Sequence, residues 1–235
     1  MIRLHPASKR HHDRRLKREV WRTFDPLDRS DHFGMLEALD ESRLPPRADI
    51  PRRAGDRGEI ITYVREGAVA YECPTGHAGV IQASEFQRMT IASGARHSEA
   101  NASRVAWAHV FQIQLRSSSR ELESRREQKR FSAAQRRGGL CIVASPDDRA
   151  GALHLGHDIW IYSALLEPGQ HVVHELAFER AAWLHVVQGD IKLGDLVLTT
   201  GDGAGVTKER AVSLTDRRHS EILLFDVAER NAPGT

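Results

Sequence analysis

Two residues of this chain could act together as ligands of a metal ion. His97 and Glu99 are separated by a single residue in the stretch Gly94 to Asn101, which reads Gly-Ala-Arg-His-Ser-Glu-Ala-Asn. On a β-strand, two-residue spacing directs both side chains to the same face. An imidazole beside a carboxylate supplies the nitrogen and oxygen ligands that non-heme iron favours. The alternative is a hydrogen-bonded His and Glu pair in a protein core, and Asn101 is expected to close a turn.

Other histidine pairs have a less suitable spacing. His171 and His174 are three residues apart, as are His154 and His157. On a strand this spacing sends the two imidazoles to opposite faces. We therefore expect these histidines to be surface or core residues.

The elements that position His97 and Glu99 are expected to be short strands. Apolar segments of strand length are separated by turn residues such as Pro45-Pro46, Glu66-Gly67 and Ser93-Gly94, which is typical of an antiparallel barrel or sandwich. The first series of expected strands covers 33–39, 59–64, 68–73, 79–81, 86–90 and 105–115. A second series covers 140–144, 158–166, 170–177, 181–187, 191–193, 196–198, 211–215 and 221–227. The prediction is an all-β protein with two β-domains.

A charged stretch separates the two series. Residues 120–129 consist of good helix formers, which predicts a short helical linker. Residues up to about 22 are polar and basic without periodicity, which predicts an exposed arm. The expected organisation is a basic N-terminal arm over 1–22, an N-terminal domain over 23–115, a linker over 116–139 and a C-terminal domain over 140–235.

The two domains also resemble each other weakly, which suggests a duplicated barrel. The segment 80–85 can be aligned with 197–202, each following an apolar strand that ends in Gly67 or Gly189. In this alignment His97 lies opposite Leu214 and Glu99 opposite Asp216. The second domain therefore lacks the imidazole, and any metal site is expected in the first.

The composition is typical of a globular protein, with 40% hydrophobic and 28% charged residues and a net charge of +2. No apolar run approaches the roughly 20 residues of a membrane helix, so no membrane partner is expected. The N-terminus lacks the apolar core of a signal peptide, which predicts a cytoplasmic protein. Cys73 and Cys141 are isolated, which favours structural thiols over a disulfide or zinc motif.

Basic residues are crowded into two segments, 9–18 and 116–137. Acidic residues cancel much of the charge of the second segment. The first segment carries no interleaved aromatic residues or recognition motif, which favours an exposed basic tail, and the second is expected to be a solvated helical linker, so nucleic acid is not an expected partner. The sequence leaves the oligomeric state open.

Several motifs resemble those of the pirin family of two-domain cupins, whose bacterial members are described as quercetin dioxygenase-like. The resemblance covers nearly the whole chain. It is carried by Glu-Ile-Ile-Thr-Tyr-Val at 59–64, Gln-Arg-Met-Thr at 87–90, Arg-His-Ser-Glu at 96–99, Glu-Gln-Lys-Arg-Phe at 127–131, Val-Ala-Ser-Pro-Asp at 143–147, Gly-Asp-Gly-Ala at 201–204 and Leu-Leu-Phe-Asp at 223–226. It implies two cupin barrels, that is, double-stranded β-helix or jelly-roll domains.

The resemblance also implies one iron-type metal in the N-terminal barrel. The ligands in the family are the His and Glu of the His-Ser-Glu motif, which match His97 and Glu99, and a His-x-His pair shortly before the Glu-Ile-Ile-Thr-Tyr strand. Counted back from Glu59, the positions of that pair fall on Arg53 and Gly55. There is no histidine between His32 and His77. The pair of imidazole ligands is therefore missing.

This departure predicts a degenerate metal site. A protein-bound divalent metal needs about three or four protein ligands, arginine has no lone pair to offer and glycine has no side chain. We hypothesise that the Arg53 guanidinium occupies the vacated space and pairs with Glu99 at a distance of roughly 3 Å. Tyr63 and Gln112 are further expected pocket residues, the latter because the family has Gln there.

Three functions remain open on this reading. The first is a non-catalytic protein that binds a small molecule or responds to stress or redox conditions, with no resident cofactor. The second is a metal-dependent quercetin 2,3-dioxygenase-type enzyme, in which Glu99 would be a metal ligand or a base. It would bind iron or another divalent metal if further ligands completed the half-site of His97 and Glu99. The third is a pirin-like transcriptional co-regulator, which rests on analogy of fold and the basic arm alone.

Overall fold

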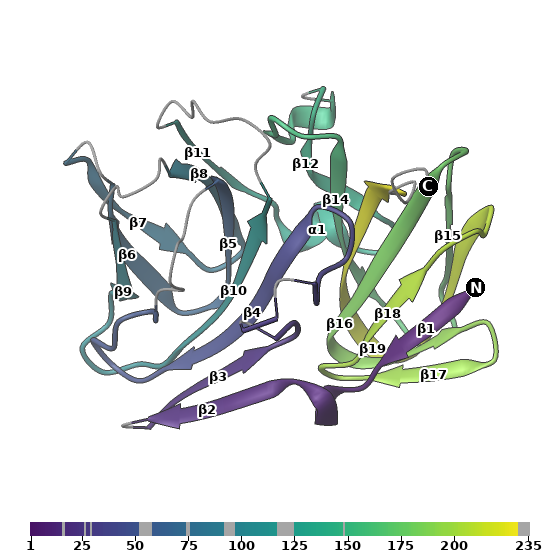
Figure 1. The fold of residues 1–235 in the computed structure, drawn as a ribbon. Helices are drawn as coiled ribbons and strands as arrows, with labels where there is room; N and C mark the ends of the chain where they lie inside the picture. The colour runs from purple at the N-terminus through teal and green to yellow at the C-terminus, as the bar shows by residue number, and fades with distance from the viewer. Residues whose placement is uncertain are drawn as a thin grey trace. The chain divides into compact units, whose positions relative to one another are not determined.

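The computed structural model describes residues 1–15, 17–25, 27–28, 30–51, 58–73, 76–91, 97–116, 125–147 and 149–229. Most of the regular structure in this part of the chain is β-strand, which confirms the all-β prediction (Figure 1). The chain divides into two compact units. We call Arg10–Phe131 the N-terminal unit, and Met1–Lys9 together with Ser132–Thr235 the C-terminal unit. The two series of strands expected from the sequence thus fall into separate units.

The N-terminal unit is built from two sheets. The larger has the strand order β11-β8-β5-β10-β4-β3-β2 and the smaller the order β7-β6-β9. The strands are β2 (His11–Arg15), β3 (Arg18–Arg22), β4 (Leu36–Leu44), β5 (Gly58–Glu66), β6 (Ala68–Glu72), β7 (Ala78–Gln82), β8 (Glu85–Ile91), β9 (Ser98–Asn101), β10 (Ala108–Leu115) and β11 (Arg126–Arg130). Antiparallel pairing between neighbours links the central strands β8, β5, β10 and β4.

The core of the N-terminal unit draws on both of its sheets. Ile60 and Val64 of β5 contribute from the larger sheet, and Val69 and Tyr71 of β6 from the smaller one. Thr62 lies between Ile60 and Val64, so strand alternation turns its side chain toward this core. We call this side of the larger sheet the Thr62 face and its other side the Tyr63 face.

The Tyr63 face carries a buried charged cluster made of Arg10, Glu41 and His109, which we call the Glu41 cluster. Arg10 NH1 donates to Glu41 Oε2 at 2.7 Å, and His109 Nε2 lies 2.8 Å from Glu41 Oε1. Burial by itself raises the pKa of Glu41. The hydrogen bond with His109 and the charge of Arg10 together outweigh this effect and lower that pKa to about 2. The three groups therefore satisfy one another in a region from which water is largely excluded.

The C-terminal unit repeats the central arrangement. Its sheet has the order β1-β18-β16-β19-β14-β12-β13, with β15 paired to β19 and β17 to β16. The series β18-β16-β19-β14 thus corresponds to β8-β5-β10-β4. The elements are β1 (Ile2–His5), η1 (Ala7–Lys9), α1 (Ala133–Arg136), β12 (Cys141–Ser145), η2 (Arg149–Gly151), β13 (Leu153–His154), β14 (Ile159–Leu166), β15 (His171–Glu175), β16 (Arg180–Leu193), β17 (Leu196–Thr199), β18 (Gly203–Val206) and β19 (Ala211–Ala228).

The core of the C-terminal unit is apolar. It is formed mainly by Val, Leu, Ile and Ala side chains of β14, β16, β18 and β19, including Leu184, Ala204 and Leu224. None of the helices in the described part of the chain has the length and apolar character needed to cross a lipid bilayer.

The prediction of an exposed arm over residues 1–22 is wrong. β1 pairs with β18 of the C-terminal unit, as Figure 1 shows for the purple strand beside β18. β2 and β3 form an antiparallel hairpin, and β3 pairs with β4 of the N-terminal unit. Arg10 and Val20 are the buried residues in its described part, and the others are exposed or partly exposed, which accommodates the basic side chains. Its backbone nevertheless completes two sheets, since it satisfies the hydrogen bonds of strands that would otherwise be edges.

The expected helical linker is also partly wrong. Residues 117–124 lie outside the described residues. The following segment 126–130 is the strand β11, which pairs with β8. Only α1, which is capped by Ser132, is an α-helix in the described part of the region 116–139. Helix propensity in 126–130 yields to cross-strand hydrogen bonding, because tertiary context overrides a preference of a few tenths of a kcal/mol per residue.

Candidate functional site

A row of polar side chains crosses the Thr62 face of the N-terminal unit. Gln87 of β8 and Gln112 of β10 are the direct cross-strand partners of Thr62. Directly opposed residues of neighbouring strands point to the same face, so the three side chains lie next to one another. Apolar residues of the same core surround them. A polar row inside an apolar core is costly unless its groups are satisfied, which marks it as a candidate site.

Glu99 of β9 is at the centre of this site. It is 7% exposed. Thr62 Oγ1 donates to Glu99 Oε1 at 2.9 Å, and Gln112 Nε2 donates to Glu99 Oε2 at 2.5 Å. Each carboxylate oxygen therefore has a neutral donor, which compensates in part for removing the carboxylate from water. The structure brings together Glu99 and Gln112, both of which were predicted as site residues.

His97 is buried and directly precedes β9. It lies two residues before Glu99, and the prediction that both side chains share one side of the chain rests on this spacing. The neighbouring strand β6 pairs Tyr71 with Glu99 and Glu72 with Ser98. Cys73 is the next residue of that segment and is buried in the same apolar cluster.

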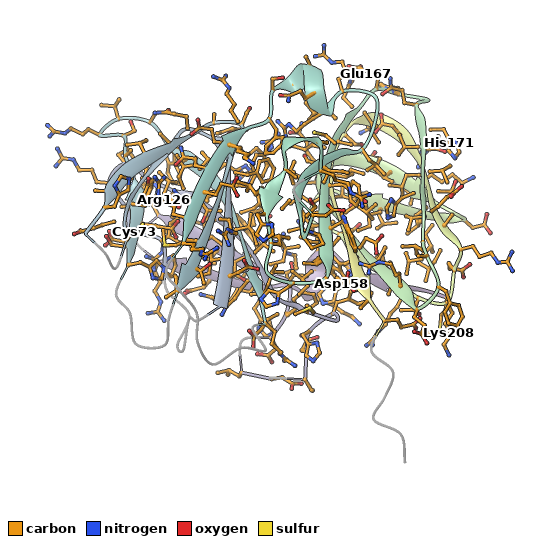
Figure 2. All side chains as sticks on the ribbon, turned by 90° about the horizontal axis from the view of Figure 1, so that it is seen from above. Cys73, Arg126, Asp158, Glu167, His171 and Lys208 are labelled. Atoms are coloured by element: carbon orange, nitrogen blue, oxygen red, sulfur yellow. The ribbon has the colours of Figure 1, made fainter. Side chains whose placement is uncertain are left out.

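Cys73 contributes a thiol that sequence reasoning did not place here. Burial raises its pKa, the charge of Arg126 opposes this rise, and the Glu99 carboxylate adds to it. Arg126 also stacks over Tyr71, with its Cζ 5.3 Å from the ring centroid. Figure 2 labels Cys73 and Arg126 side by side. A thiol with a raised pKa is neutral at physiological pH, so Cys73 is a structural residue of the wall and no nucleophile.

Gln87 is a second residue of this site that the sequence did not predict. Its Nε2 donates to Gln128 Oε1 at 3.1 Å, whereas its buried Oε1 has no hydrogen-bond donor among the residues that the structure describes. The side chain is 1% exposed. Thr62 and Gln87 could have been found by applying strand alternation to the segments around them, once the face carrying Glu99 was known.

Tyr63 does not line this site. It follows Thr62 on β5, so its side chain lies on the opposite face. There it stacks on Phe86 with ring centroids 4.2 Å apart and on Phe111 at 6.1 Å. The expected pocket role of Tyr63 is therefore corrected: the tyrosine is part of an aromatic cluster on the Tyr63 face. Strand pattern alone left the facing undetermined because both faces of this sheet are buried.

Arg53 and Gly55 lie outside the described residues, and so does the hypothesised pair between Arg53 and Glu99. The donor set for a metal can still be judged. Within the described residues, no group of three or more His, Cys, Asp or Glu side chains could hold a metal ion. His97 and Glu99 supply two ligands, and both oxygens of Glu99 accept hydrogen bonds. Arginine and glycine side chains offer no further ligand atom. Among the described residues, this set therefore offers fewer than the three or four protein ligands that a divalent metal needs.

The C-terminal unit shows what the same positions look like without a site. The two units can be aligned on one pair of residues in corresponding strands: Val64 with Val110 in the N-terminal unit, and Val186 with Ile222 in the C-terminal unit. Thr62 lies two residues before Val64, and Leu184 lies two residues before Val186. The polar row of Thr62, Gln87 and Gln112 therefore corresponds to an apolar row of Leu184, Ala204 and Leu224. The polar row is thus specific to the N-terminal unit.

Comparisons with known proteins agree with the division into two β-units. Residues 10–115 match the family described as Pirin, and residues 142–227 match the family described as Quercetinase C-terminal cupin domain. A protein named quercetin 2,3-dioxygenase from Escherichia coli strain K12 is 32% identical over 231 residues, which cover 97% of this chain and 99% of the relative. A pirin-like protein from Caulobacter vibrioides is 29% identical, over 87% of this chain and 88% of the relative.

A solved pirin structure has a similar fold over nearly the whole chain. The bacterial pirin YhhW from Escherichia coli, in complex with nickel(II), matches with a TM-score of 0.89 and 31% identity. The match covers 98% of this chain and 100% of that chain.

Proposed function

The chain belongs to the pirin family of two-domain cupins, and on this premise we propose that its N-terminal barrel binds a small molecule at the Glu99 site without metal-dependent dioxygenation. Family membership confirms the predicted fold of two cupin barrels. The observation that carries the proposal is the state of Glu99. Both of its oxygens already accept hydrogen bonds from neutral side chains of the same barrel.

The sequence supports the same proposal independently. The positions at which the family has its His-x-His pair are Arg53 and Gly55 here. Arginine is permanently charged and has no lone pair to offer, so in place of a histidine ligand it would oppose the binding of a cation. Loss of two imidazole ligands weakens metal affinity by more than the 10- to 100-fold that loss of an outer-shell partner typically costs.

The buried polar groups of the site indicate the chemistry of its ligand. Among the described residues, Gln87 Oε1 is a buried acceptor without a donor. The Glu99 carboxylate accepts from Thr62 and Gln112, and a carboxylate has further lone pairs for the donors of a ligand. A ligand that presents hydroxyl or amino donors satisfies such groups, whereas a ligand that presents only acceptors leaves them unpaired. We therefore infer a hydroxylated organic molecule of small size, with quercetin as the first probe.

A second candidate function is a metal-dependent quercetin 2,3-dioxygenase-type activity. It is favoured by the name of the Escherichia coli relative and by the nickel(II) in the solved bacterial pirin. In that case Glu99 would be a metal ligand or a base, and a further ligand would have to come from residues other than Arg53 and Gly55.

Metal analysis and oxygen uptake separate the two candidates. Purified protein is analysed for bound metals, then incubated in separate samples with iron(II) and nickel(II), and assayed with quercetin in an oxygen electrode. The proposal expects substoichiometric metal and no oxygen uptake above that of free metal. One equivalent of bound metal with quercetin-dependent oxygen consumption would establish the second candidate instead.

Quercetin binding is measured in parallel by difference absorbance with matched variants. Glu99→Gln keeps the shape of the side chain and removes its charge, and the proposal expects weaker binding. Glu72→Gln changes an exposed carboxylate of the neighbouring strand and is expected to bind like the wild type. Equal binding by Glu99→Gln and the wild type would place the ligand elsewhere.

A further inference from the structure

The C-terminal unit contains a buried carboxylate that the proposed function does not use. Asp216 of β19 is 2% exposed, and within the described part of the chain neither of its carboxylate oxygens has a hydrogen-bond partner. Leu214, two residues earlier on the same strand, belongs to the apolar core, so alternation turns Asp216 toward the interior of the unit. An unpaired buried carboxylate is expensive, and each such group requires an explanation.

Corresponding positions in the two units identify what Asp216 replaces. Gly67 and Gly189 both have positive φ, at 79° and 92°, where the chain turns out of the central sheet. Two residues after Gly67, Val69 pairs with Asn101, and two residues after Gly189, Ile191 pairs with Asp216. Asp216 therefore corresponds to Asn101. The sequence alignment that placed it opposite Glu99 is off by two residues.

Backbone hydrogen bonds support the correspondence. The amide of Asn101 donates to the carbonyl of Ala48 at 2.9 Å, and the amide of Asp216 donates to that of Gln170 at 2.8 Å. Each acceptor ends a turn of the same kind: Ala48 N bonds Pro45 O, and Gln170 N bonds Glu167 O. The turn at 45–48 thus corresponds to the turn at 167–170.

In the N-terminal unit the side-chain amide of Asn101 binds this turn. Its Nδ2 donates to the carbonyl oxygens of Leu44 at 3.1 Å, Pro45 at 3.1 Å and Ala106 at 2.9 Å. Its Oδ1 accepts from Ser103 N at 2.9 Å. Asn101 therefore closes the loop, as the sequence predicted, because an amide nitrogen can satisfy carbonyl oxygens that converge on it.

An aspartate cannot make these bonds. Ionised, it has acceptors only, and in the C-terminal unit the carbonyls that correspond to those of Leu44 and Pro45 belong to Leu166 and Glu167. By its correspondence with Asn101, the Asp216 carboxylate faces these carbonyl oxygens, and such groups repel each other unless a cation lies between them. We propose that Asp216, with the carbonyl oxygens of Leu166 and Glu167, holds a hard cation such as calcium or sodium.

The chemistry of the donors selects the class of cation. All three are oxygens, which calcium, sodium and magnesium prefer, whereas nickel and zinc prefer nitrogen and sulfur. Calcium tolerates irregular oxygen shells completed by water, while magnesium demands nearly ideal octahedral geometry. With one carboxylate, the site belongs with weak calcium sites, for which Kd is on the order of 10⁻⁴ to 10⁻³ M.

A shallow groove of about 490 Å³ lies beside the turn. Its walls include Pro168, Gly189, Asp190, Arg217, Arg218 and His219. Two of the basic groups are paired with acids: Arg218 with Asp190 at 3.5 Å, and His219 with Glu167 at 2.7 Å. Glu167, labelled in Figure 2, directly follows β14. These pairs reduce the repulsion that a cation near Asp216 would meet, whereas the charge of Arg217 opposes the cation.

Thermal unfolding of the full chain tests the site with two matched variants. Asp216→Asn introduces the amide that the N-terminal unit already uses, and Asp195→Asn changes an exposed acid of the same unit. Each protein is melted in calcium, sodium, potassium or magnesium chloride, with ionic strength held constant by tetramethylammonium chloride. Equilibrium dialysis against calcium measures binding directly.

We expect the Tm of the wild type and of Asp195→Asn to rise by about 3 to 6 °C at a cation concentration tenfold above Kd. Asp216→Asn should melt higher than the wild type without added cation and should not respond to it. The site is refuted if the wild type responds to none of the cations, if all of them act equally, or if Asp216→Asn retains the response and the bound calcium.

Discussion

Replacing Glu41 with glutamine removes the negative charge at the centre of the Glu41 cluster while keeping the shape of the side chain. In the folded protein the pKa of Glu41 is lowered from 4.5 to about 2, because the hydrogen bond with His109 and the charge of Arg10 outweigh the effect of burial. The side chain is 9% exposed, so solvent screens these interactions little. A difference of this size corresponds to about 3 kcal/mol of stability at pH 7.

The sign of the pH dependence follows from the lowered pKa. The contribution of Glu41 is fully present above the pKa of the unfolded chain, near 4.5, and is lost as the pH falls toward 2. Urea unfolding should therefore show Glu41→Gln to be less stable than the wild type by about 3 kcal/mol at pH 7, and by about half of that at pH 3. Glutamine at position 41 does not titrate, so the difference between the proteins reports the titration of Glu41 together with its coupling to His109.

Glu72→Gln serves as the control, because Glu72 is exposed on β6 of the same unit. It should unfold like the wild type at both pH values. A destabilisation by Glu41→Gln that stays constant from pH 7 to pH 3, or one below about 1 kcal/mol at pH 7, would refute the account of the Glu41 cluster.

Two further predictions concern backbone shape and a second buried pair. Gly67→Ala should destabilise the protein more than Gly76→Ala in thermal melts, because both glycines have positive φ but only at Gly67 would a Cβ come within 2.7 Å of a backbone oxygen, that of Trp107. Equal losses would contradict this reason. Arg136→Met should cost about 3 to 5 kcal/mol in urea unfolding, since it leaves Glu221 buried without the guanidinium 2.9 Å away, and adding Glu221→Leu should recover much of the loss. No recovery would mean that Arg136 acts through packing alone.

Strand alternation accounts for what the sequence predicted of the site. The two-residue spacing of His97 and Glu99 predicted that their side chains share one face of a strand, and this prediction needed no knowledge of their partners. The identity of those partners depended on which face of β5 meets β9, and both faces of β5 are buried. Periodicity therefore could not choose between Thr62 and Tyr63, whereas the tertiary fold does.

The N-terminal segment shows another limit of composition as a guide. Its strands carry mostly charged side chains, and Val20 is the only buried hydrophobic residue within β2 and β3. Their position is determined by backbone pairing with β4, a long-range contact that leaves little trace in local pattern. The repeat alignment failed because the segment from Glu85 to Asn101 is two residues longer than the corresponding segment from Asp202 to Asp216, a difference that the sequence pattern did not reveal.

The central proposal is that the N-terminal barrel does not bind a metal ion, because Arg53 and Gly55 replace two histidine ligands. Calorimetric titration of nickel(II) into dialysed protein tests it most directly, with the wild type compared to the double variant Arg53→His/Gly55→His. We predict no one-site isotherm for the wild type. We predict a one-site isotherm for the double variant that is lost again when Glu99→Ala is added. A wild-type protein that binds one nickel ion per chain, and loses it with Glu99→Ala, would contradict the account.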